Sequence, residues 1–389
     1  MLMKAKPKIL LFIDWYRPGY RAGGPIQSCA NLVDSLSDQF DFNIVTRNTD
    51  YCSIEPYLGI VPDTWIQQNN GSRIFYFSDK NLALSSIKEI CRDPSYDLVY
   101  VNGIYSLYFS IAPLFFLRKD KKKKVIVAVR GMLASSAIQV KKHKKSVFIF
   151  LSKLFGLYKR VLFQASTNLE RNDIVLAMGK NAAIFLAPNL PAKINNYGLK
   201  PLAKEFGKLK LVSIARISPE KNLLFALNVL KNCKASIEFD FYGPVYDKNY
   251  FEQCMRFCKD LPSNIVVNYR DAIESNKVND ILKQYHYLFL PTLGENFGHV
   301  IFESLSVGCP VIISDKTPWR QLQSKGVGYD LPLEQKAMFV DCIERVAELD
   351  QQAFSQTSVN AASFAQGYLN ADASLNQNKQ MFESQLNIS

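Results

Sequence analysis

Four charged side chains between apolar runs have the types and spacing to do chemistry. Glu295 and Glu303 flank "NFGHVIF", and Arg216 and Lys221 lie in "ARISPEKNL" around a Ser218-Pro219 turn. Burying an unpaired charge is costly, so carboxylates inside an apolar segment either face water or bind something. Carboxylates can accept hydrogen bonds from hydroxyl groups, and two cations at the end of a strand can hold a diphosphate. Together, the four predict a pocket for a sugar nucleotide.

Each of these motifs has a simpler interpretation when it is taken alone. The glutamates could be solvated surface residues, and the "ISPEK" segment could be an ordinary surface turn. Eight helical residues turn through about 800°, so the two glutamates would not share one face of a continuous helix. We therefore place Glu295 in a loop and Glu303 in the second turn of a helix that begins near Phe297 or Gly298. The free amides at residues 298–300 would suit a phosphate.

The elements that must position these residues alternate between short strands and helices, which predicts an α/β fold with parallel sheets. The expected strands share β-branched or aromatic runs: 8–14, 42–48, 73–77, 97–103, 124–131, 160–166, 183–189, 209–216, 236–244, 264–270, 287–292 and 309–315. In such sheets, ligands bind where strands end and helices begin.

The length of 389 residues suits about two domains. We expect an N-terminal Rossmann-like domain at 1–190, a linker at 191–207 that is rich in Pro, Asn, Gly and Lys, and a C-terminal Rossmann-like domain at 208–365. Residues 366–389 are expected to form a helix that returns to the first domain.

Composition and local sequence argue against a disordered, a disulfide-stabilised or a membrane-spanning protein. The chain is 48% hydrophobic and 21% charged, as in folded globular proteins. It has eight cysteines but no CxxC, which favours reduced thiols in a cytoplasmic protein. The uncharged segment 98–117 is long enough to span a membrane, but Asn102-Gly103 and Pro113 predict a strand followed by a helix.

The net charge of +12 is concentrated in one region. Residues 101–200 carry 18 Lys and Arg against 3 Asp and Glu. A local positive field implies a local anionic partner. In 141–160, lysines flank apolar residues, so this helix could lie on an anionic membrane surface. Alternatively, its apolar residues could pack on the first sheet beneath a solvated basic face.

The sequence resembles the retaining GT-B glycosyltransferases of family 4. The resemblance rests on "ENFGHVIFE", "SLSVGCPVI", "ARISPEKNL", "FYGP" and "GYRAGGP", and it spans most of the chain. It implies two Rossmann-like domains whose parallel sheets face a cleft, with 1–190 as the acceptor domain and 208–365 as the nucleotide-sugar domain. "VIVAVRGMLASSAI" and "TPW" are similar to a subset that builds bacterial surface polysaccharides, including lipopolysaccharide.

The resemblance also implies roles for individual residues. Arg216 and Lys221 would bind the donor diphosphate, Glu303 the ribose and Glu295 the donor sugar. The donor would also contact a further set of residues: Gly23, Gly24, Arg130, Arg270, Asn296, Phe297, Gly298 and His299. Many relatives carry a histidine where this chain has Arg130-Gly131, and arginine stays charged, so Arg130 is not expected to be a general acid.

The expected chemistry is hexosyl transfer with retention, in which the leaving diphosphate helps to deprotonate the acceptor. No Asp-x-Asp occurs in the chain, so we expect no metal and no other cofactor. The expected partners are a UDP- or GDP-sugar, a glycan or lipid-linked acceptor, and an anionic membrane surface through residues 119–160, on the inner face of the cell membrane. No nucleic acid is expected, because it would leave the second-half site unexplained.

Three other classes are open to test. A sugar-nucleotide epimerase and a catalytically inactive sugar-nucleotide-binding protein fit the same two-domain plan. A dinucleotide oxidoreductase would need Gly-x-Gly-x-x-Gly after the first strand, which this chain lacks.

Overall fold

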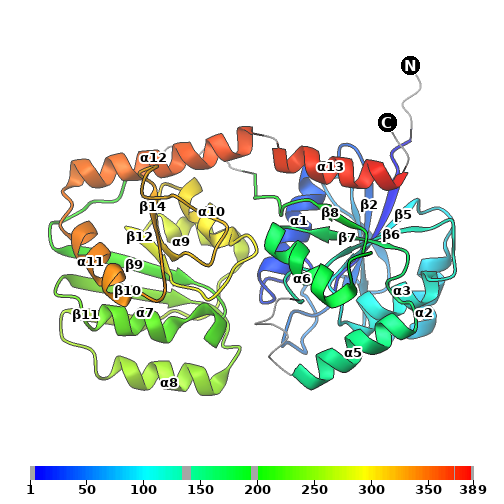
Figure 1. The fold of residues 1–389 in the computed structure, drawn as a ribbon, viewed down its shortest axis with the longest axis horizontal. Coiled ribbons are helices and arrows are strands. Elements are labelled where there is room, and N and C mark those ends of the chain that lie inside the picture. The colour runs from blue at the N-terminus through cyan, green and yellow to red at the C-terminus, as the bar shows by residue number, and fades with distance from the viewer. Residues whose placement is uncertain (1–4, 134–141, 194–199, 372, 387–389) are drawn as a thin grey trace. The chain divides into compact units, whose positions relative to one another are not determined.

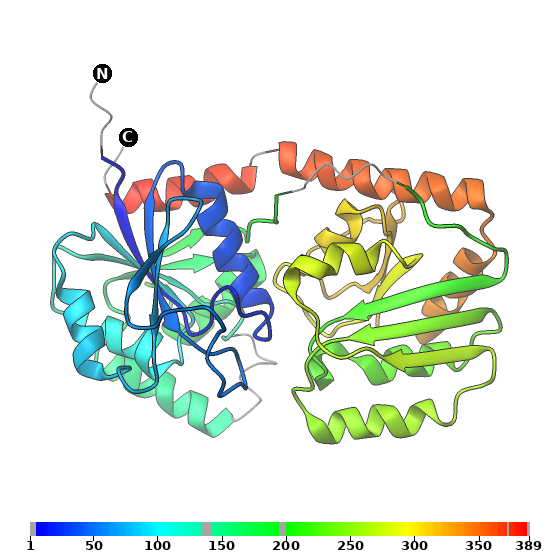
Figure 2. The same ribbon diagram turned by 180° about the vertical axis from the view of Figure 1, so that it is seen from behind.

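The structure is a computed structural model that describes residues 5–133, 142–193, 200–371 and 373–386. The chain divides into two compact units. Unit 1 combines Met1–Leu190 with Asp372–Ser389, and unit 2 is Pro191–Ala371. Figure 1 labels most of the elements of both units, and Figure 2 shows the same ribbon from behind.

The sheet of unit 1 has the order β3-β4-β2-β1-β5-β6-β7-β8 among the described residues. All its neighbouring strands are parallel except β3, which is antiparallel to β4. The strands are β1 (Lys8–Phe12), β2 (Asp41–Arg47), β3 (Trp65–Gln67), β4 (Arg73–Phe77), β5 (Leu98–Asn102), β6 (Lys124–Ala128), β7 (Val161–Ala165) and β8 (Ile184–Leu186).

Helices cover both faces of this sheet. They are α1 (Gly24–Leu36), α2 (Leu84–Arg92), the π-helix η1 (Leu107–Ile111), α3 (Ala112–Leu117), α5 (Lys142–Leu154), α6 (Asn168–Met178) and α13 (Ala373–Leu386). One core lies beneath α1 and α13, and the other beneath α2, η1, α3, α5 and α6. Because both faces are buried, β1 reads as the continuous apolar run "ILLF".

The C-terminal helix α13 is an integral part of unit 1. Its Met381 and Phe382 are fully buried. Phe382 packs against the rings of Phe40, Phe42 and Tyr100. The last helix therefore completes the core whose first strand begins at Lys8.

The sheet of unit 2 is wholly parallel, with the order β11-β10-β9-β12-β13-β14. Its strands are β9 (Lys208–Ile214), β10 (Ser236–Tyr242), β11 (Ile265–Tyr269), β12 (Tyr287–Leu290), β13 (Val311–Ser314) and β14 (Gly328–Leu331). Its helices are η2 (Pro219–Lys221), α7 (Leu223–Leu230), α8 (Lys248–Cys258), η3 (Ser275–Lys277), α9 (Val278–Leu282), α10 (His299–Ser306), α11 (Lys336–Ala347) and α12 (Gln351–Asn370). One core lies beneath α7, α8 and α11, and the other beneath α9, α10 and α12.

Every expected strand is present, and the α/β fold with two parallel sheets is confirmed. The structure adds β3 and β14, which the sequence did not predict. Part of the expected linker packs on unit 2, because Lys204 is buried and its Nζ donates to the carbonyl oxygen of Ala347. The C-terminal helix was expected at 366–389, but residue 366 lies within α12. The helix that belongs to unit 1 is α13, which starts at Ala373.

The uncharged segment 98–117 is not one helix but β5, η1 and α3. Among the described residues, no helix is long and apolar enough to cross a bilayer.

Candidate active site

The strand order of unit 2 reverses between β9 and β12. From β9 the chain builds outward through β10 and β11, and from β12 it builds the other way through β13 and β14. In open parallel sheets, the crevice at the carboxyl ends of the two strands beside such a reversal is the usual ligand site. Arg216 follows β9, and Glu295 follows β12. The topology therefore brings the two motifs predicted from the sequence to the same place.

The loop after β9 has a defined backbone. Its η2 turn ends at Asn222, which has a left-handed φ of 60° and precedes α7. Gly243, in "FYGP", lies directly beneath this loop at a φ of 145°. A Cβ at Gly243 would lie 1.8 Å from the carbonyl oxygen of Ala215, so only glycine fits there. In the same loop, the Arg216 guanidinium carbon lies 5.2 Å from the ring centroid of Tyr246.

Hydrogen bonds join the loop after β12 to the η2 turn. The Leu293 amide and the Thr292 hydroxyl both donate to the carbonyl oxygen of Glu220, at 2.9 and 3.2 Å. In return, the Asn222 side chain donates to the carbonyl oxygen of Pro291 at 3.0 Å. The two loops therefore form one connected surface.

An ion pair completes this connection. Lys221 Nζ lies 2.6 Å from Glu295 Oε1, and the two side chains are only 13% and 15% exposed. A pair shielded from water interacts more strongly than one on an open surface. Lys221, which is predicted to bind the diphosphate, thus contacts Glu295, which is predicted to bind the donor sugar.

The start of α10 has the features expected of an anion site. Gly298 has a left-handed φ of 76°, and a Cβ there would lie 2.7 Å from a methyl group of Ile301. The amides of Ile301 and Phe302 donate to the Gly298 carbonyl oxygen, and the amides at residues 298–300 lie at the N-terminal end of the helix. Glu303 is the fifth helical residue, in the second turn as predicted.

The neighbours of Gly298 differ in burial. Phe297 is buried, with its ring 4.8 Å from that of His299 and 5.3 Å from that of Trp319. Asn296 and His299 are partly exposed. Phe297 therefore anchors this loop through its side chain, and only its backbone can face a ligand.

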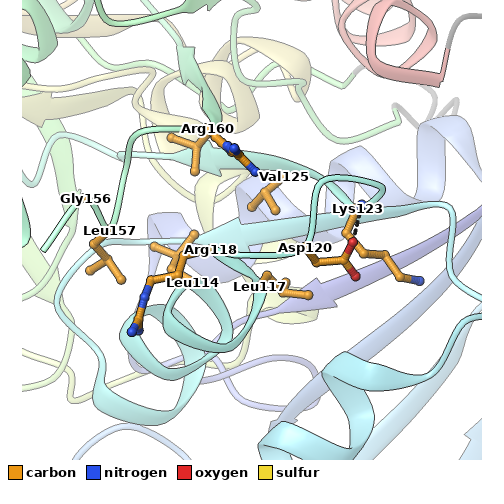
Figure 3. A pocket seen from close by; sticks show the side chains of 10 residues that line it. Leu114, Leu117, Arg118, Asp120, Lys123, Val125, Gly156, Leu157 and Arg160 are labelled. Carbon is orange, nitrogen blue, oxygen red and sulfur yellow. Dashed lines mark hydrogen bonds between the residues drawn. The ribbon is translucent and has the colours of Figure 1, made fainter.

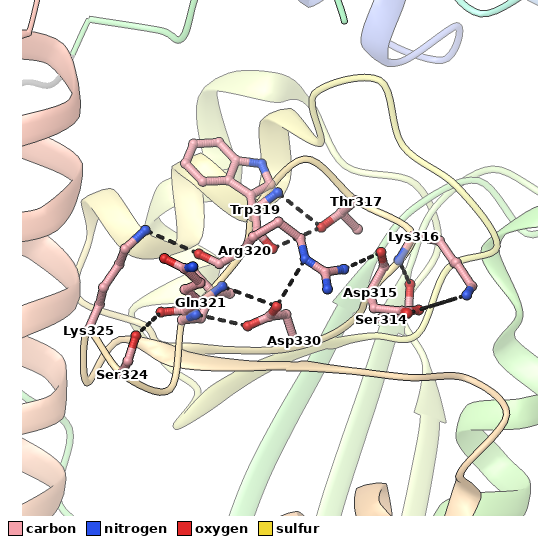
Figure 4. A network of polar contacts seen from close by, with 11 residues as sticks. Ser314, Asp315, Lys316, Thr317, Trp319, Arg320, Gln321, Ser324, Lys325 and Asp330 are labelled. Carbon is pink, nitrogen blue, oxygen red and sulfur yellow. Dashed lines mark hydrogen bonds and ion pairs between the residues drawn. The ribbon is translucent and has the colours of Figure 1, made fainter. Parts of the chain in front are cut away.

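The "TPW" loop after β13 supports the site, a role that the sequence did not predict. Trp319 Nε1 donates to the carbonyl oxygen of Phe297, and the Glu295 amide donates to that of Lys316 at 3.2 Å. The loop itself is held by Arg320, whose Nε lies 3.3 Å from an Asp330 oxygen (Figure 4). The only hint in the sequence was the quoted "TPW" motif.

Arg270 follows β11 and is held by a buried carboxylate. Its Nε donates to Asp240 Oδ2 at 2.8 Å, and Asp240 also accepts hydrogen bonds from Asn268 and Tyr285. Burial alone would raise the pKa of Asp240, but these three hydrogen bonds lower it. Half of the Arg270 side chain remains exposed.

The remaining predicted residues lie in unit 1. Gly23, with a φ of 69°, and Gly24 stand at the start of α1, with open space where a Cβ would be added. Arg130 follows β6 at a φ of 54°. Its guanidinium donates to Asn102 and Tyr100, both at 2.8 Å, and to Asn189. These protein contacts occupy three of its nitrogens.

Two of the three histidines, His143 and His286, lie outside the motifs of the candidate site. His286 is buried beside β12; its Nδ1 accepts from the Lys210 amide at 2.8 Å, so its Nε2 donates to the carbonyl oxygen of Ala203. Burial lowers its pKa to about 4. The side chain of His143 lies outside the described residues. Across the described residues, no group of three His, Cys, Asp or Glu side chains could hold a metal ion.

Comparisons with known proteins show a family-model match in unit 2 and a shared fold. Residues 199–361 match the family model described as glycosyl transferases group 1, and this range contains Arg216, Lys221, Glu295 and Glu303. The chain has the GT-B fold. Sucrose-phosphate synthase from Thermosynechococcus elongatus superimposes with a TM-score of 0.68 at 15% identity, over 99% of this chain and 100% of that one.

Two further GT-B structures are similar over nearly their whole length. HepE of Anabaena, in complex with UDP and glucose, has a TM-score of 0.66 at 14% identity and covers 97% of this chain and 99% of that one. A glycosyltransferase from Rickettsia africae has a TM-score of 0.67 at 11% identity, with 99% and 100% covered. No curated protein matches the sequence.

Proposed function

We propose that this chain is a retaining glycosyltransferase that moves a hexosyl group from a UDP- or GDP-sugar to a glycan or lipid-linked acceptor. The observation that carries the proposal is the Lys221–Glu295 ion pair at the strand-order reversal of unit 2, since it places a cation for phosphate beside a carboxylate for hydroxyls. The group 1 match over the same residues supports it, as does the UDP bound by HepE.

In this proposal, Arg216, Lys221 and the start of α10 bind the diphosphate. Glu303 accepts hydrogen bonds from the ribose, and Glu295 from the donor sugar. The bond between the sugar C1 and the diphosphate breaks while the acceptor oxygen bonds to C1 on the same face. The acceptor proton passes to the leaving diphosphate oxygen, so no separate base is required. The cations and helix amides stabilise the negative charge that develops on the diphosphate.

Turnover is proposed to need no metal, because the cations of the site supply the positive charge. The absence of Asp-x-Asp from the sequence supports this.

A two-step experiment tests the proposal. Thermal stabilisation by UDP, GDP or ADP identifies the base, and the matching nucleotide-sugar is then incubated with a panel of glycan and lipid-linked acceptors. Release of nucleoside diphosphate together with a larger glycan supports a transferase. Conversion of the donor into an isomeric nucleotide-sugar would identify an epimerase, and tight binding without turnover would identify an inactive relative.

A surface of unit 1 supports a membrane-bound acceptor in bacterial surface polysaccharide synthesis. Along α5 and just after it, five apolar side chains are exposed: Val147, Phe150, Leu151, Leu154 and Phe155. Ile149 packs inward, so the helix satisfies its core contacts and still presents an apolar face. Lys153, Lys159 and Arg160 accompany that face. An apolar face with basic neighbours suits the inner, anionic surface of the cell membrane.

A small pocket lies next to this surface. Figure 3 shows its lining, which combines apolar side chains such as Leu114, Leu117 and Leu157 with Arg118 and Arg160. In this proposal, the membrane-facing surface extends from α5 to the end of α3. Of the lysines that the sequence assigned to this surface, Lys141 and the side chains of Lys142 and Lys144 lie outside the described residues.

Liposome sedimentation tests the membrane proposal. Phe150→Ser with Phe155→Ser removes two rings that are 65% and 67% exposed, and should abolish sedimentation with anionic vesicles at low salt. The matched control is Phe206→Ser, because Phe206 of unit 2 is 73% exposed. Equal sedimentation of wild type and the double variant would refute the membrane role of this surface. That result would not bear on the proposed nucleotide site.

A further inference from the structure

The backbone of Lys221 is held on both sides by the loop that follows β12. The carbonyl oxygen of Glu220, the residue before it, accepts two hydrogen bonds from that loop, at 2.9 and 3.2 Å. The side chain of Asn222, the residue after it, donates to the carbonyl oxygen of Pro291 at 3.0 Å. The position from which the Lys221 side chain extends is therefore fixed by contacts on either side.

The loop after β12 is itself anchored in the sheet of unit 2. Thr292 is fully buried, and its carbonyl oxygen accepts a 2.5 Å hydrogen bond from the hydroxyl of Ser314, the last residue of β13. A hydrogen bond to this loop therefore fixes the η2 turn relative to two strands of the sheet.

Asn222 has a backbone conformation that glycine adopts at lower cost. It lies between η2 and α7 in the left-handed region, with φ 60° and ψ 36°. Its amide donates to the carbonyl oxygen of Pro219 at 3.1 Å, and its own carbonyl oxygen accepts from the Ala226 amide at 3.2 Å. Glycine could make both of these backbone bonds, so the hydrogen bond to Pro291 is what the asparagine side chain adds.

The consequence of that hydrogen bond falls on the neighbouring ion pair. Lys221 Nζ lies 2.6 Å from Glu295 Oε1, and the two side chains are only 13% and 15% exposed. A shift of the Lys221 backbone would separate the ammonium group from the carboxylate. It would leave a charge that is largely shielded from water without its partner, which is costly.

We propose that Asn222 is a positioning residue that holds the Lys221 ammonium group against Glu295 and toward the donor diphosphate. It acts through Lys221 and does not itself bind the donor. Its effect on the diphosphate rests on the proposed transferase function, whereas its effect on the Lys221–Glu295 pair does not.

Asn222→Gly tests the proposal, because it keeps the backbone conformation and removes only the side-chain hydrogen bond. Gln321→Gly is the matched backbone control, since Gln321 has a φ of 60°, is exposed, and has no side-chain hydrogen bond within the part of the chain that the structure describes. Asn264→Ala is the hydrogen-bond control. The Asn264 side chain donates to two carbonyl oxygens at the amino end of β11, the edge of the sheet opposite the candidate site.

The first measurement needs no nucleotide. Limited acetylation of the full chain with acetic anhydride, followed by peptide mass spectrometry, reports how well the Lys221 amine is protected. Asn222→Gly should acetylate at Lys221 at least about threefold faster than wild type, because the shielded pair opens more often. Both controls should react at Lys221 as wild type does. Unchanged Lys221 reactivity in Asn222→Gly would overturn the proposal.

The second measurement is calorimetry with UDP and uridine. Asn222→Gly should lower UDP affinity about fivefold, the usual effect of one neutral hydrogen bond, and leave uridine affinity unchanged. In the Lys221→Met background, Asn222→Gly should have no further effect on UDP, because its influence passes through Lys221. Equal losses for UDP and uridine, or a further loss in the double variant, would contradict positioning through Lys221.

Stability distinguishes positioning from a structural role. Asn222→Gly loses a hydrogen bond but relieves a left-handed backbone, so its thermal midpoint should stay within about 3 °C of wild type. A larger fall, including failure to fold, would show a structural role and overturn the proposal. If wild type binds no nucleotide at all, the proposed transferase function fails, while the acetylation result still decides whether Asn222 holds the ion pair.

Discussion

Substitutions of Lys221 and Glu295 should have opposite effects on nucleotide binding, although the two residues form one ion pair. Lys221→Met removes the cation that would face the diphosphate. A hydrogen bond to a charged group contributes about 1.5–3 kcal/mol. Because 1.4 kcal/mol is a factor of ten, UDP affinity should fall roughly 12- to 140-fold. Uridine, which has no phosphate, should bind as it does to wild type.

Glu295→Gln should instead strengthen UDP binding. The Glu295 carboxylate, 2.6 Å from Lys221 Nζ and only 15% exposed, competes with the diphosphate for the same cation and repels it. Removing its charge should raise UDP affinity several-fold while turnover falls, because the donor sugar loses its acceptor. The double variant should bind UDP more tightly than Lys221→Met alone, since the unpaired carboxylate is gone.

Isothermal titration calorimetry measures the affinities of wild type, both single variants and the double variant for UDP and for uridine. The matched control is Lys316→Met, because Lys316 Nζ pairs with the exposed Glu334 rather than with Glu295. The control should stay within about twofold of wild type, as is usual for surface changes. If Glu295→Gln weakens UDP binding as much as Lys221→Met, or if uridine binding falls equally, the diphosphate assignment is incorrect.

Four further outcomes are expected. Glu303→Gln should weaken uridine and UDP equally, by about 1.5–3 kcal/mol, because the ribose is common to both; calorimetry checks this. Gly243→Ala should cost more than about 4 kcal/mol of unfolding free energy because its Cβ would strike Ala215, whereas Gly367→Ala on exposed α12 should gain up to about 1 kcal/mol in urea titrations. Activity should persist in EDTA, and a strict magnesium or manganese requirement would contradict the metal-free site. Stability should fall as pH drops from 6.5 to 4, because the His286 pKa is lowered from 6.5 to about 4 and only the unfolded chain takes up the proton there. His286→Gln should remove up to about 3 kcal/mol of that loss in denaturation curves at the two pH values.

The strands and the helix that begins near Gly298 could be predicted because both sheets are buried on both faces. Continuous apolar runs such as "YLFL" at β12 follow directly from that burial. β3 ("WIQ") and β14 ("GYDL") were missed because these short edge strands mix apolar with polar residues, whereas the equally short edge strand β8 ("IFL") is wholly apolar.

The charged motifs of the candidate site could be found, but not their pairing. Lys221 and Glu295 are 74 residues apart, and only the adjacency of β9 and β12 brings them together. The same limit applies to Arg130, whose partners Asn102 and Asn189 come from other strand ends.

The position of α13 in unit 1 has a consequence for the order of synthesis. Residues 8–190 leave the ribosome long before Met381 and Phe382, yet these two side chains are fully buried in the core of unit 1. Until α13 has been synthesised, the surface of Phe40, Phe42 and Tyr100 that Phe382 covers is open to water or to a chaperone. A premature stop in α12 would release a chain with a complete unit 2 sheet but with part of the unit 1 core exposed to solvent. Such a product should be removed by proteases rather than accumulate as a partly active enzyme.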